Sequence, residues 1–438
     1  MTKFWALFDK GLLALYSVFY ALIVIRILPK SEYGLLVLVL NLFGWAKIVI
    51  NSLGQRPLSH FIAADVKGEE RKYTITNAIG WNVSISVILS IFFILSIPFF
   101  NKIFHTQRMG VLINFIPLLI AANFFQDFCI AILRGLLRMG RVVIIDATRI
   151  FFSILLISIY IMYDKLNSSE AVLMIYIISF FMASIAGLVM CRDSFRLSTN
   201  FHWELMKKQM HFGKYLFGIN LGTLIYMQTD IFMLGALLNP AAVAIYGVAR
   251  RMSEFLRSFS EAMAMVISPQ AAALSAKKDK KALEKLLVKN LAQVILVFAP
   301  TSLILILSAN FIFNFFFDGK YNDSIIYFQL LTAIMFFSSV TKVIGPIIAN
   351  GLLRPDINFK FLWIASLSNI ILNFLFIPVL QIHGAIIATA ACIMINLVSL
   401  FIFVIIKLEI SILEIGKDIL FNMMLTFKMV YNRIKREA

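Results

Sequence analysis

Four charged residues recur on one face of an otherwise apolar stretch, residues 241–267. They are spaced by four, three and four positions: Arg250, Glu254, Arg257 and Glu261. At 100° per residue, a helix places these four side chains in one narrow stripe. A charge near the middle of a bilayer costs at least ~2.5 kcal/mol on insertion scales, so the stripe must face a water-filled cavity or partner charges.

Two interpretations of this stripe remain open. In the first, Arg250–Glu254 and Arg257–Glu261 are ion pairs one helical turn apart that help neighbouring helices to associate. In the second, the stripe lines a cavity and binds a charged substrate. Arg251 favours the second interpretation, because position 255 is phenylalanine and offers no carboxylate one turn further on. We therefore expect the arginines of this stretch to attract an anion.

The composition is that of a polytopic membrane protein. The chain has 438 residues, of which 61% are hydrophobic, and apolar runs recur from one end to the other. Only 14% of the residues are charged, yet the net charge is +17. In a membrane protein such basic residues mark cytoplasmic loops rather than a nucleic-acid surface. The three cysteines lie within apolar runs, so neither a disulfide framework nor a metal site is expected.

With about 20 residues needed to cross a bilayer, the sequence predicts an all-α fold of twelve transmembrane helices. Lysine and arginine concentrate in alternate loops, which predicts that both termini are cytoplasmic. We expect the N-terminal apolar run to be a retained first span, because no A-x-A-like cleavage site follows it. The predicted spans are residues 5–28, 33–54, 76–100, 110–133, 142–163, 171–191, 214–238, 241–267, 288–316, 324–349, 358–380 and 384–406.

The sequence also repeats itself. Gly-Leu-Leu-Arg occurs at 135–138 and at 351–354, and Tyr-Gly occurs at 33–34 and at 246–247. These offsets predict two six-helix bundles, 1–191 and 214–406, joined by a cytoplasmic linker, 192–213. Because each half has an even number of spans, the repeats are parallel and a central cavity should lie between them. Residues 407–438 are predicted to form a basic amphipathic tail on the inner membrane surface.

Further polar residues fall inside predicted spans. Lys47 lies ~21 Å from the outer end of its helix, which is too deep for its ammonium group to reach water easily. Asp230 and Asp127 are buried acids that could bind and release an ion during transport, and Glu254 belongs to the same class of candidate. The alternative for Asp230 is a structural partner for Arg250 or Arg251.

The intramembrane cations outnumber these acids, so a cavity lined by them should attract an anion. Guanidinium groups bind pyrophosphate especially well. The loops are short and carry no catalytic, phosphate-binding or zinc-binding motif, so we expect a transporter without cofactor rather than an enzyme or an ATP-driven pump.

Several motifs in order resemble one family. They are ILPKSEYG at 27–34, QTDIFMLG at 228–235, AIYGVA at 244–249, ISP at 267–269, FDGKY at 317–321, GLLR at 351–354 and the stretch 369–389. Together they resemble the polysaccharide-unit flippases of the multidrug/oligosaccharidyl-lipid/polysaccharide exporter superfamily, over nearly the whole chain.

This resemblance implies alternating access by two bundles and the export of an undecaprenyl-pyrophosphate-linked oligosaccharide, of O-antigen or capsule type, across the bacterial inner membrane. It also implies coupling to a gradient of protons or sodium ions, contact with membrane lipids and a polysaccharide polymerase as partner. Related lipid II flippases use arginines of spans 1, 2 and 8, and Arg26, Arg56, Arg250 and Arg251 occupy similar spans here. Competing interpretations are export of lipid II or cationic drugs by the same fold, and a membrane-embedded polysaccharide polymerase or ligase.

Overall fold

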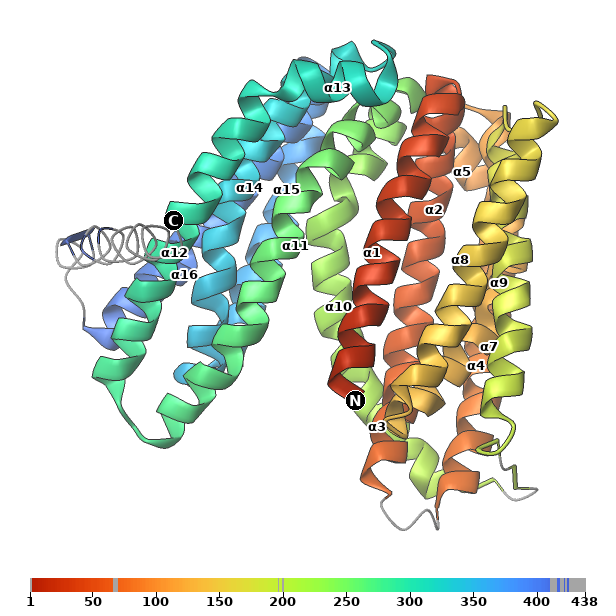
Figure 1. Cartoon of the computed structure of the whole chain (residues 1–438), viewed down its shortest axis with the longest axis horizontal. Helices are drawn as coiled ribbons and strands as arrows, with labels where there is room; N and C mark the ends of the chain where they lie inside the picture. The colour runs from red at the N-terminus through yellow and green to blue at the C-terminus, as the bar shows by residue number, and fades with distance from the viewer. Residues whose placement is uncertain are drawn as a thin grey trace, which may run out of the picture. The chain divides into compact units, whose positions relative to one another are not determined.

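The computed structural model describes residues 2–65, 70–195, 197–198 and 201–409, together with 416–417, 421 and 424. Within this part of the chain the secondary structure is helical, with no strand, and twelve helices have at least 21 residues. They are α1 (Thr2–Ile27), α2 (Lys30–Ile50), α4 (Arg71–Leu95), α7 (Phe115–Gly135), α8 (Met139–Met162), α9 (Ser169–Cys191), α10 (Trp203–Leu237), α11 (Pro240–Ala276), α12 (Lys280–Leu307), α14 (Ile325–Pro346), α15 (Pro355–Leu380) and α16 (Ile382–Leu408) (Figure 1).

Nine of the described helical stretches are long and apolar enough to cross a membrane. The long helices α1, α10 and α11 account for the other three predicted spans. The prediction of an all-α polytopic membrane fold is therefore confirmed. Shorter elements connect or extend the spans: α3 (Arg56–Ala64), α5 (Ile97–Ile103), α6 (Gln107–Ile113), α13 (Ala309–Phe317), a 3-10 turn (Asn322–Ser324) and two π-helical segments (Asn51–Gln55 and Ile347–Gly351).

Several helix ends differ from the predicted span limits. Helix α12 begins at Lys280 rather than at 288, because the side chain of Asp279 caps it by accepting a hydrogen bond from the backbone N–H of Ala282 at 2.9 Å. Helix α10 begins at Trp203, inside the predicted linker, and α11 continues through Pro269 to Ala276. Hydropathy locates the residues that lipid covers, whereas these helices continue into polar sequence beyond them.

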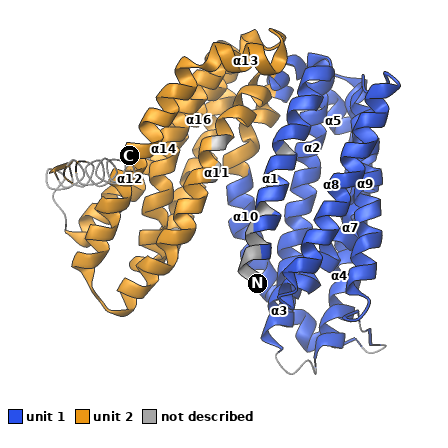
Figure 2. Cartoon of the chain, in the orientation of Figure 1, with its two compact units in different colours: residues 1–224, 235–244 blue, residues 225–234, 245–438 orange. Residues whose placement is uncertain are grey.

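Unit 1 comprises Met1–Leu224 and Gly235–Ala244 (Figure 2). Within it α9 packs against both α7 and α8, and α8 packs against α1. Its buried core includes Leu58, Phe128 and Val142. The chain before α10 is fixed to α4 by paired hydrogen bonds: the Asn77 side chain donates to the carbonyl oxygen of His202 at 2.8 Å and accepts from its backbone N–H at 3.2 Å. The N-terminal part of α10 therefore belongs to this unit.

Unit 2 comprises Ile225–Leu234 and Ile245–Ala438 (Figure 2). Here α16 packs against both α14 and α15, and α12 packs against α14. Its buried core includes Leu287, Val294 and Val343. The middle of α10 and most of α11 thus belong to unit 2, and every contact described below for the charged stripe lies within it.

The two units repeat the same turns. Leu137 and Leu353, in the two Gly-Leu-Leu-Arg motifs, have φ values of 57° and 55°, and each lies between a long helix and the next. Asp164 and Gln381 follow, with φ values of 52° and 53°, before α9 and α16. Because leucine rarely adopts positive φ, the recurrence of this conformation at matching positions supports a common architecture for α7–α9 and α14–α16.

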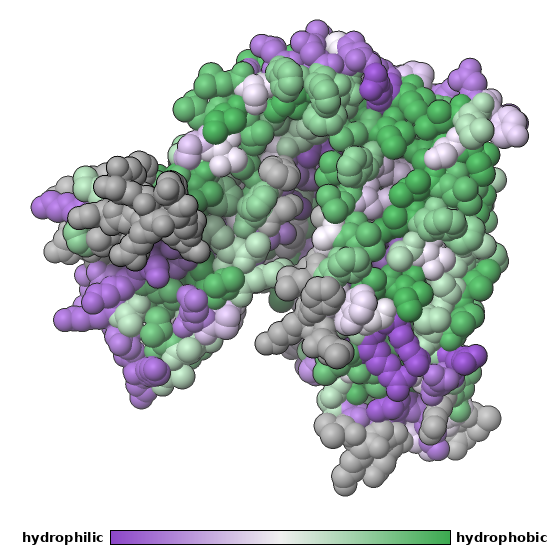
Figure 3. All heavy atoms as spheres, in the orientation of Figure 1, coloured by the Kyte–Doolittle hydropathy of each residue, from purple (hydrophilic) through white to green (hydrophobic). Residues whose placement is uncertain are grey.

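The surface of each unit fits a membrane environment. Hydrophobic side chains cover much of the visible sides of the long helices, and hydrophilic ones gather near the helix ends (Figure 3). Helix α16 ends at Leu408. The basic amphipathic tail predicted for 407–438 falls almost entirely outside the described residues, so it stays a prediction.

Candidate functional site

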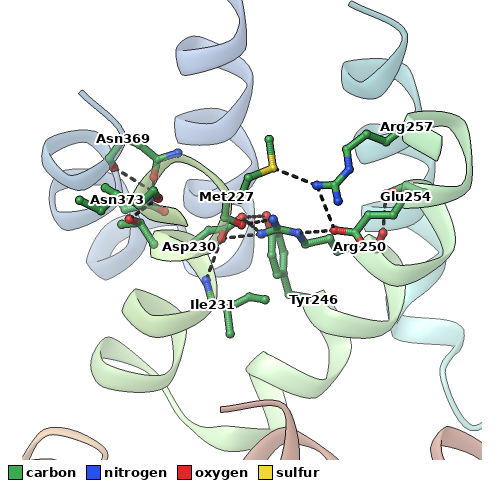
Figure 4. Close-up of polar contacts among 12 residues, drawn as sticks. Met227, Asp230, Ile231, Tyr246, Arg250, Glu254, Arg257, Asn369 and Asn373 are labelled. Atoms are coloured by element: carbon green, nitrogen blue, oxygen red, sulfur yellow. Dashed lines mark hydrogen bonds and ion pairs between the residues drawn. The ribbon is translucent and has the colours of Figure 1, made fainter. Parts of the chain in front are cut away.

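The charged stripe of α11 meets a carboxylate of α10. The Arg250 guanidinium lies 2.6 Å from both carboxylate oxygens of Asp230 through its Nη1 atom (Figure 4). Only 10% of the Arg250 side chain and 4% of the Asp230 side chain are exposed. Of the two interpretations of Asp230, the pairing with Arg250 is the one that the structure displays.

Three further groups complete the pair. The Tyr246 hydroxyl donates to Asp230 Oδ2, and the backbone N–H of Ile231 donates to Asp230 Oδ1 at 3.0 Å. Arg250 Nη2 donates to the carbonyl oxygen of Met227 (Figure 4). Tyr246 is completely buried. Since each charge is taken from water, these additional hydrogen bonds are what make the burial of the pair tolerable.

The remainder of the stripe forms a chain of ion pairs. Arg250 Nε lies 3.4 Å from Glu254 Oε1, and Arg257 Nε lies 3.4 Å from Glu261 Oε1. Arg257 also approaches Glu254 at 3.8 Å and contacts the Met227 sulfur at 3.0 Å. The two i, i+4 pairs expected from the spacing are thus present. Arg257 and Glu261 are more exposed than Arg250, with 29% and 47% of their side chains accessible.

A small cavity of about 20 Å³ adjoins the Arg250–Asp230 pair, which is room for about one water molecule. Oxygen-bearing side chains from three more helices line it: Ser338 of α14, Asn369 of α15 and Thr389 of α16. Asn369 Oδ1 accepts a hydrogen bond from Asn373 at 2.5 Å (Figure 4), whereas the buried Thr389 hydroxyl has no hydrogen-bond partner in the described chain. Carboxylate, amide and hydroxyl oxygens are the ligands that hard cations prefer.

Residue type and spacing alone do not mark Ser338, Asn369 or Thr389 as site residues. Asn369 and Asn373 are spaced by four residues in an apolar helix, and this polar i, i+4 pair was the available signal. Thr389 has no polar residue one helical turn before or after it, so only the packing of α16 brings it to the cavity.

Unit 1 contains a second intramembrane ion pair. Lys47 Nζ of α2 lies 2.9 Å from Asp127 Oδ2 of α7, and Asn123 donates to the same oxygen at 2.5 Å. The Lys47 ammonium is also 5.8 and 5.6 Å from the ring centroids of Phe43 and Phe180. The depth argument for Lys47 is consistent with this pairing, since its charge is neutralised within the unit.

The other predicted site residues, Arg26, Arg56 and Arg251, are exposed. Arg26 lies in the last turn of α1 and Arg56 is the first residue of α3, both in unit 1, whereas Arg251 belongs to unit 2. Arg26 and Arg251 each have interactions of their own. The absence of a carboxylate one turn after Arg251 therefore does not leave this residue without a partner.

Comparisons with known proteins identify the family. A family model described as "Polysaccharide biosynthesis protein" matches residues 23–326. An uncharacterized membrane protein of Methanocaldococcus jannaschii is 24% identical over 83% of this chain and 75% of its own length. A probable low-salt glycan biosynthesis flippase of Haloferax volcanii is 23% identical over 70% of this chain, which spans only 63% of that relative.

Two solved structures share the fold. An inward-facing multidrug resistance transporter of the MATE family, in the MOP superfamily, aligns with a TM-score of 0.73 over 92% of this chain and 96% of its own. The lipid II flippase MurJ, in an inward closed conformation, aligns with a TM-score of 0.67 over 97% and 93%. Both are 15% identical in sequence, so the likeness concerns the fold alone. The family model matches more than half of the chain, so this chain belongs to the polysaccharide biosynthesis protein family.

Proposed function

We propose that this protein is a flippase for an undecaprenyl-pyrophosphate-linked oligosaccharide repeat unit, of O-antigen or capsule type. It moves this lipid from the cytoplasmic to the outer leaflet of the inner membrane by alternating access. The observation that carries the proposal is the family match over residues 23–326. The name of the Haloferax volcanii relative, a probable glycan biosynthesis flippase, supports the same class of substrate.

The substrate site is built on arginine. A guanidinium group binds pyrophosphate oxygens through parallel hydrogen bonds, as it binds a carboxylate. Arg250 is engaged by Asp230 in this structure, so a pyrophosphate must compete with that carboxylate. Arg251 and Arg257 are further substrate-binding candidates on α11. Within unit 1 the candidates are Arg26, Arg56 and Lys47, and Lys47 would have to leave Asp127 to bind the substrate.

The coupling ion acts at Asp230. A proton or a sodium ion bound there neutralises the carboxylate and weakens its hold on Arg250, which is then available to the pyrophosphate. The cavity oxygens of Ser338, Asn369 and Thr389 lie where they can complete the shell of such an ion. Asp127 and Glu254 are the alternative ion sites in this proposal. Ion and substrate thus bind cooperatively, because each favours the state in which the ion pair is open.

The proposed membrane orientation rests on the distribution of charge, and the proposed role and partner rest on the family. Both termini lie in the cytoplasm, since the predicted cytoplasmic loops hold most of the lysine and arginine. The protein acts as a transporter rather than as an enzyme, and a polysaccharide polymerase is its expected partner on the outer side.

The test is translocation of a lipid-pyrophosphate-linked oligosaccharide between the leaflets of vesicles that contain the purified protein. We expect transfer to the far leaflet under a proton or sodium gradient, and its loss in Arg250→Gln and Asp230→Asn. The matched control is Lys207→Gln, which removes a cation from an exposed ion pair with Glu204 at 3.0 Å.

Lipid II and a cationic drug are tested in parallel vesicles. If the protein transports one of these and does not transfer the oligosaccharide, the transported compound is the substrate and the proposed substrate is wrong. Elongation of the glycan without transfer would make the protein a polymerase.

A further inference from the structure

An apolar groove runs between α11 and α12, on a part of unit 2 separate from the Arg250–Asp230 pair. It has a volume of about 520 Å³, and its walls include Phe259, Ala262 and Val266 of α11 and Val297 of α12. Phe259, Val266 and Val297 are each more than half exposed, at 54%, 58% and 56%. Large apolar side chains therefore border an open channel instead of filling it.

Three polar residues line the groove, Asn290, Gln293 and Thr301, and two of them donate hydrogen bonds within their own helix. Asn290 donates its side-chain N–H to the carbonyl oxygen of Leu286 at 2.7 Å, and the Thr301 hydroxyl donates to that of Val297 at 2.6 Å. Both donors are thus satisfied by the preceding turn of their own helix. From Asn290 to Thr301 the α12 wall extends over ~17 Å at 1.5 Å per residue. The result is a long wall suited to a hydrocarbon chain.

Two lysines precede the α12 wall. Lys289 comes one turn before Gln293 and Lys285 one turn earlier; because each step of four residues advances about 40° around a helix, Lys289 lies close to the face of Gln293 and Lys285 is turned about 80° from it. Lys285 and Lys289 are exposed, and neither forms a salt bridge within the described part of the chain. Hydrophilic residues gather around the α11–α12 turn (Figure 3). The exposed Lys277 and Lys278 lie in this turn, and the exposed Lys281 lies in the first turn of α12.

We infer that this groove is an arrival site for the lipid-linked substrate: the isoprenoid tail lies between α11 and α12, and Lys285 and Lys289 bind the pyrophosphate. The inference rests on the proposed function, and it adds a binding site before Arg250 is reached. The occupant follows from the arrangement of charge, because a hydrocarbon groove that ends at a lysine cluster matches a lipid with one anionic end. In the predicted orientation the lysines lie on the cytoplasmic side, where the substrate is assembled.

The groove is bounded by side chains from two adjacent helices, α11 and α12. The floor behind the groove belongs to the core of unit 2, with Leu256 and Phe298 at 1% and 3% exposure, so the groove cannot deepen without disturbing that core.

The experiment measures binding apart from transport. The purified full chain, in phosphatidylcholine nanodiscs, is titrated with radiolabelled undecaprenyl pyrophosphate that carries no sugar. We expect Ala262→Trp, which fills the groove from an exposed position, to weaken binding at least about tenfold. The double variant Lys285→Gln, Lys289→Gln should weaken it by a similar factor, with a smaller salt dependence than that of the wild type.

Two matched controls accompany these variants. Leu303→Trp adds the same ring at a lipid-exposed position of α12 that is not in the groove, and Lys207→Gln, Lys208→Gln removes two exposed lysines elsewhere. Both should bind as the wild type does. A photoreactive carrier should label α11 and α12 in the wild type and leave them unlabelled in Ala262→Trp.

The outcomes separate this site from the transport proposal. Wild-type affinity in Ala262→Trp, or displacement of the label by equimolar phosphatidylglycerol, overturns the isoprenoid site even if the protein flips its substrate. Binding that depends on the groove and the lysines establishes the site even if no oligosaccharide reaches the far leaflet, in which case the flippase proposal fails alone.

Discussion

The two intramembrane ion pairs differ in how tightly their charges are held. In unit 2, Asp230 faces a guanidinium with two contacts at 2.6 Å, a tyrosine hydroxyl and a backbone N–H, and 4% of its side chain is exposed. In unit 1, Asp127 faces one ammonium at 2.9 Å and one amide, and 17% of its side chain is exposed.

This difference separates a fixed network from a looser pair. A planar guanidinium that is hydrogen-bonded on several sides has little freedom, whereas an ammonium on a flexible stem, 28% exposed here, can exchange partners. A ligand must therefore provide more free energy to open the Arg250–Asp230 pair than to displace Lys47. A ligand that opens the Arg250–Asp230 pair must therefore bind the open state much more tightly than the closed state. Such a difference in affinity between two states is what a coupling step requires.

Among the substitutions that test this difference between the ion pairs, Arg250→Met should have the largest effect. It leaves Asp230 buried without a countercharge, so we expect a loss of about 3–5 kcal/mol in the free energy of unfolding. Detergent or denaturant unfolding of the purified protein measures it. The double variant Arg250→Met, Asp230→Asn should recover much of the loss, because no lone charge remains. A double variant as unstable as Arg250→Met would contradict the assignment of the loss to the stranded carboxylate.

Tyr246→Phe tests the hydroxyl that reaches Asp230. Because the substitution keeps the ring and removes one hydrogen bond to a charged group, we expect a loss of about 1.5–3 kcal/mol in the free energy of unfolding. The effect should disappear in an Asp230→Ala background, and persistence there would attribute it to packing instead.

Lys47→Met is the equivalent change in unit 1, and its effect should be smaller, about 1–2 kcal/mol in the free energy of unfolding. Asp127 keeps the hydrogen bond from Asn123 and some access to water. The same unfolding assay applies, with Lys47→Met, Asp127→Asn as the paired control. A loss equal to that of Arg250→Met would show that the two ion pairs contribute equally to stability, which would contradict the difference described above.

Arg257→Gln should have the smallest effect on stability, below about 1 kcal/mol, because its carboxylate partners are 25% and 47% exposed and screened by solvent. Its effect on transport should be larger than its effect on unfolding, since the proposed function gives it a place beside the pyrophosphate. Translocation and unfolding measured on the same preparation separate the two. A variant that transports at the wild-type rate would remove Arg257 from the substrate site.

Local spacing was sufficient to predict the stripe on α11, since an α-helix places residues four apart on one face whatever surrounds it. The partner of Arg250 was not determined by spacing, because Asp230 lies 20 residues away on another helix. Asp230 was identified as a candidate because it is a carboxylate in an apolar span, and its pairing was left open. Ser338, Asn369 and Thr389 reach the cavity through the packing of three more helices, which hydropathy does not encode.

The paired Gly-Leu-Leu-Arg turns bear on how the chain is inserted into the membrane. Each turn ends on an arginine, Arg138 in unit 1 and Arg354 in unit 2, immediately before the helix that follows. Positive charge in short loops is what the insertion machinery reads to choose the side on which a loop remains. If both turns lie on the cytoplasmic side, as the charge distribution predicts, each unit carries its own orientation signal at the same turn. Insertion of the second unit would then not depend on the first helix alone.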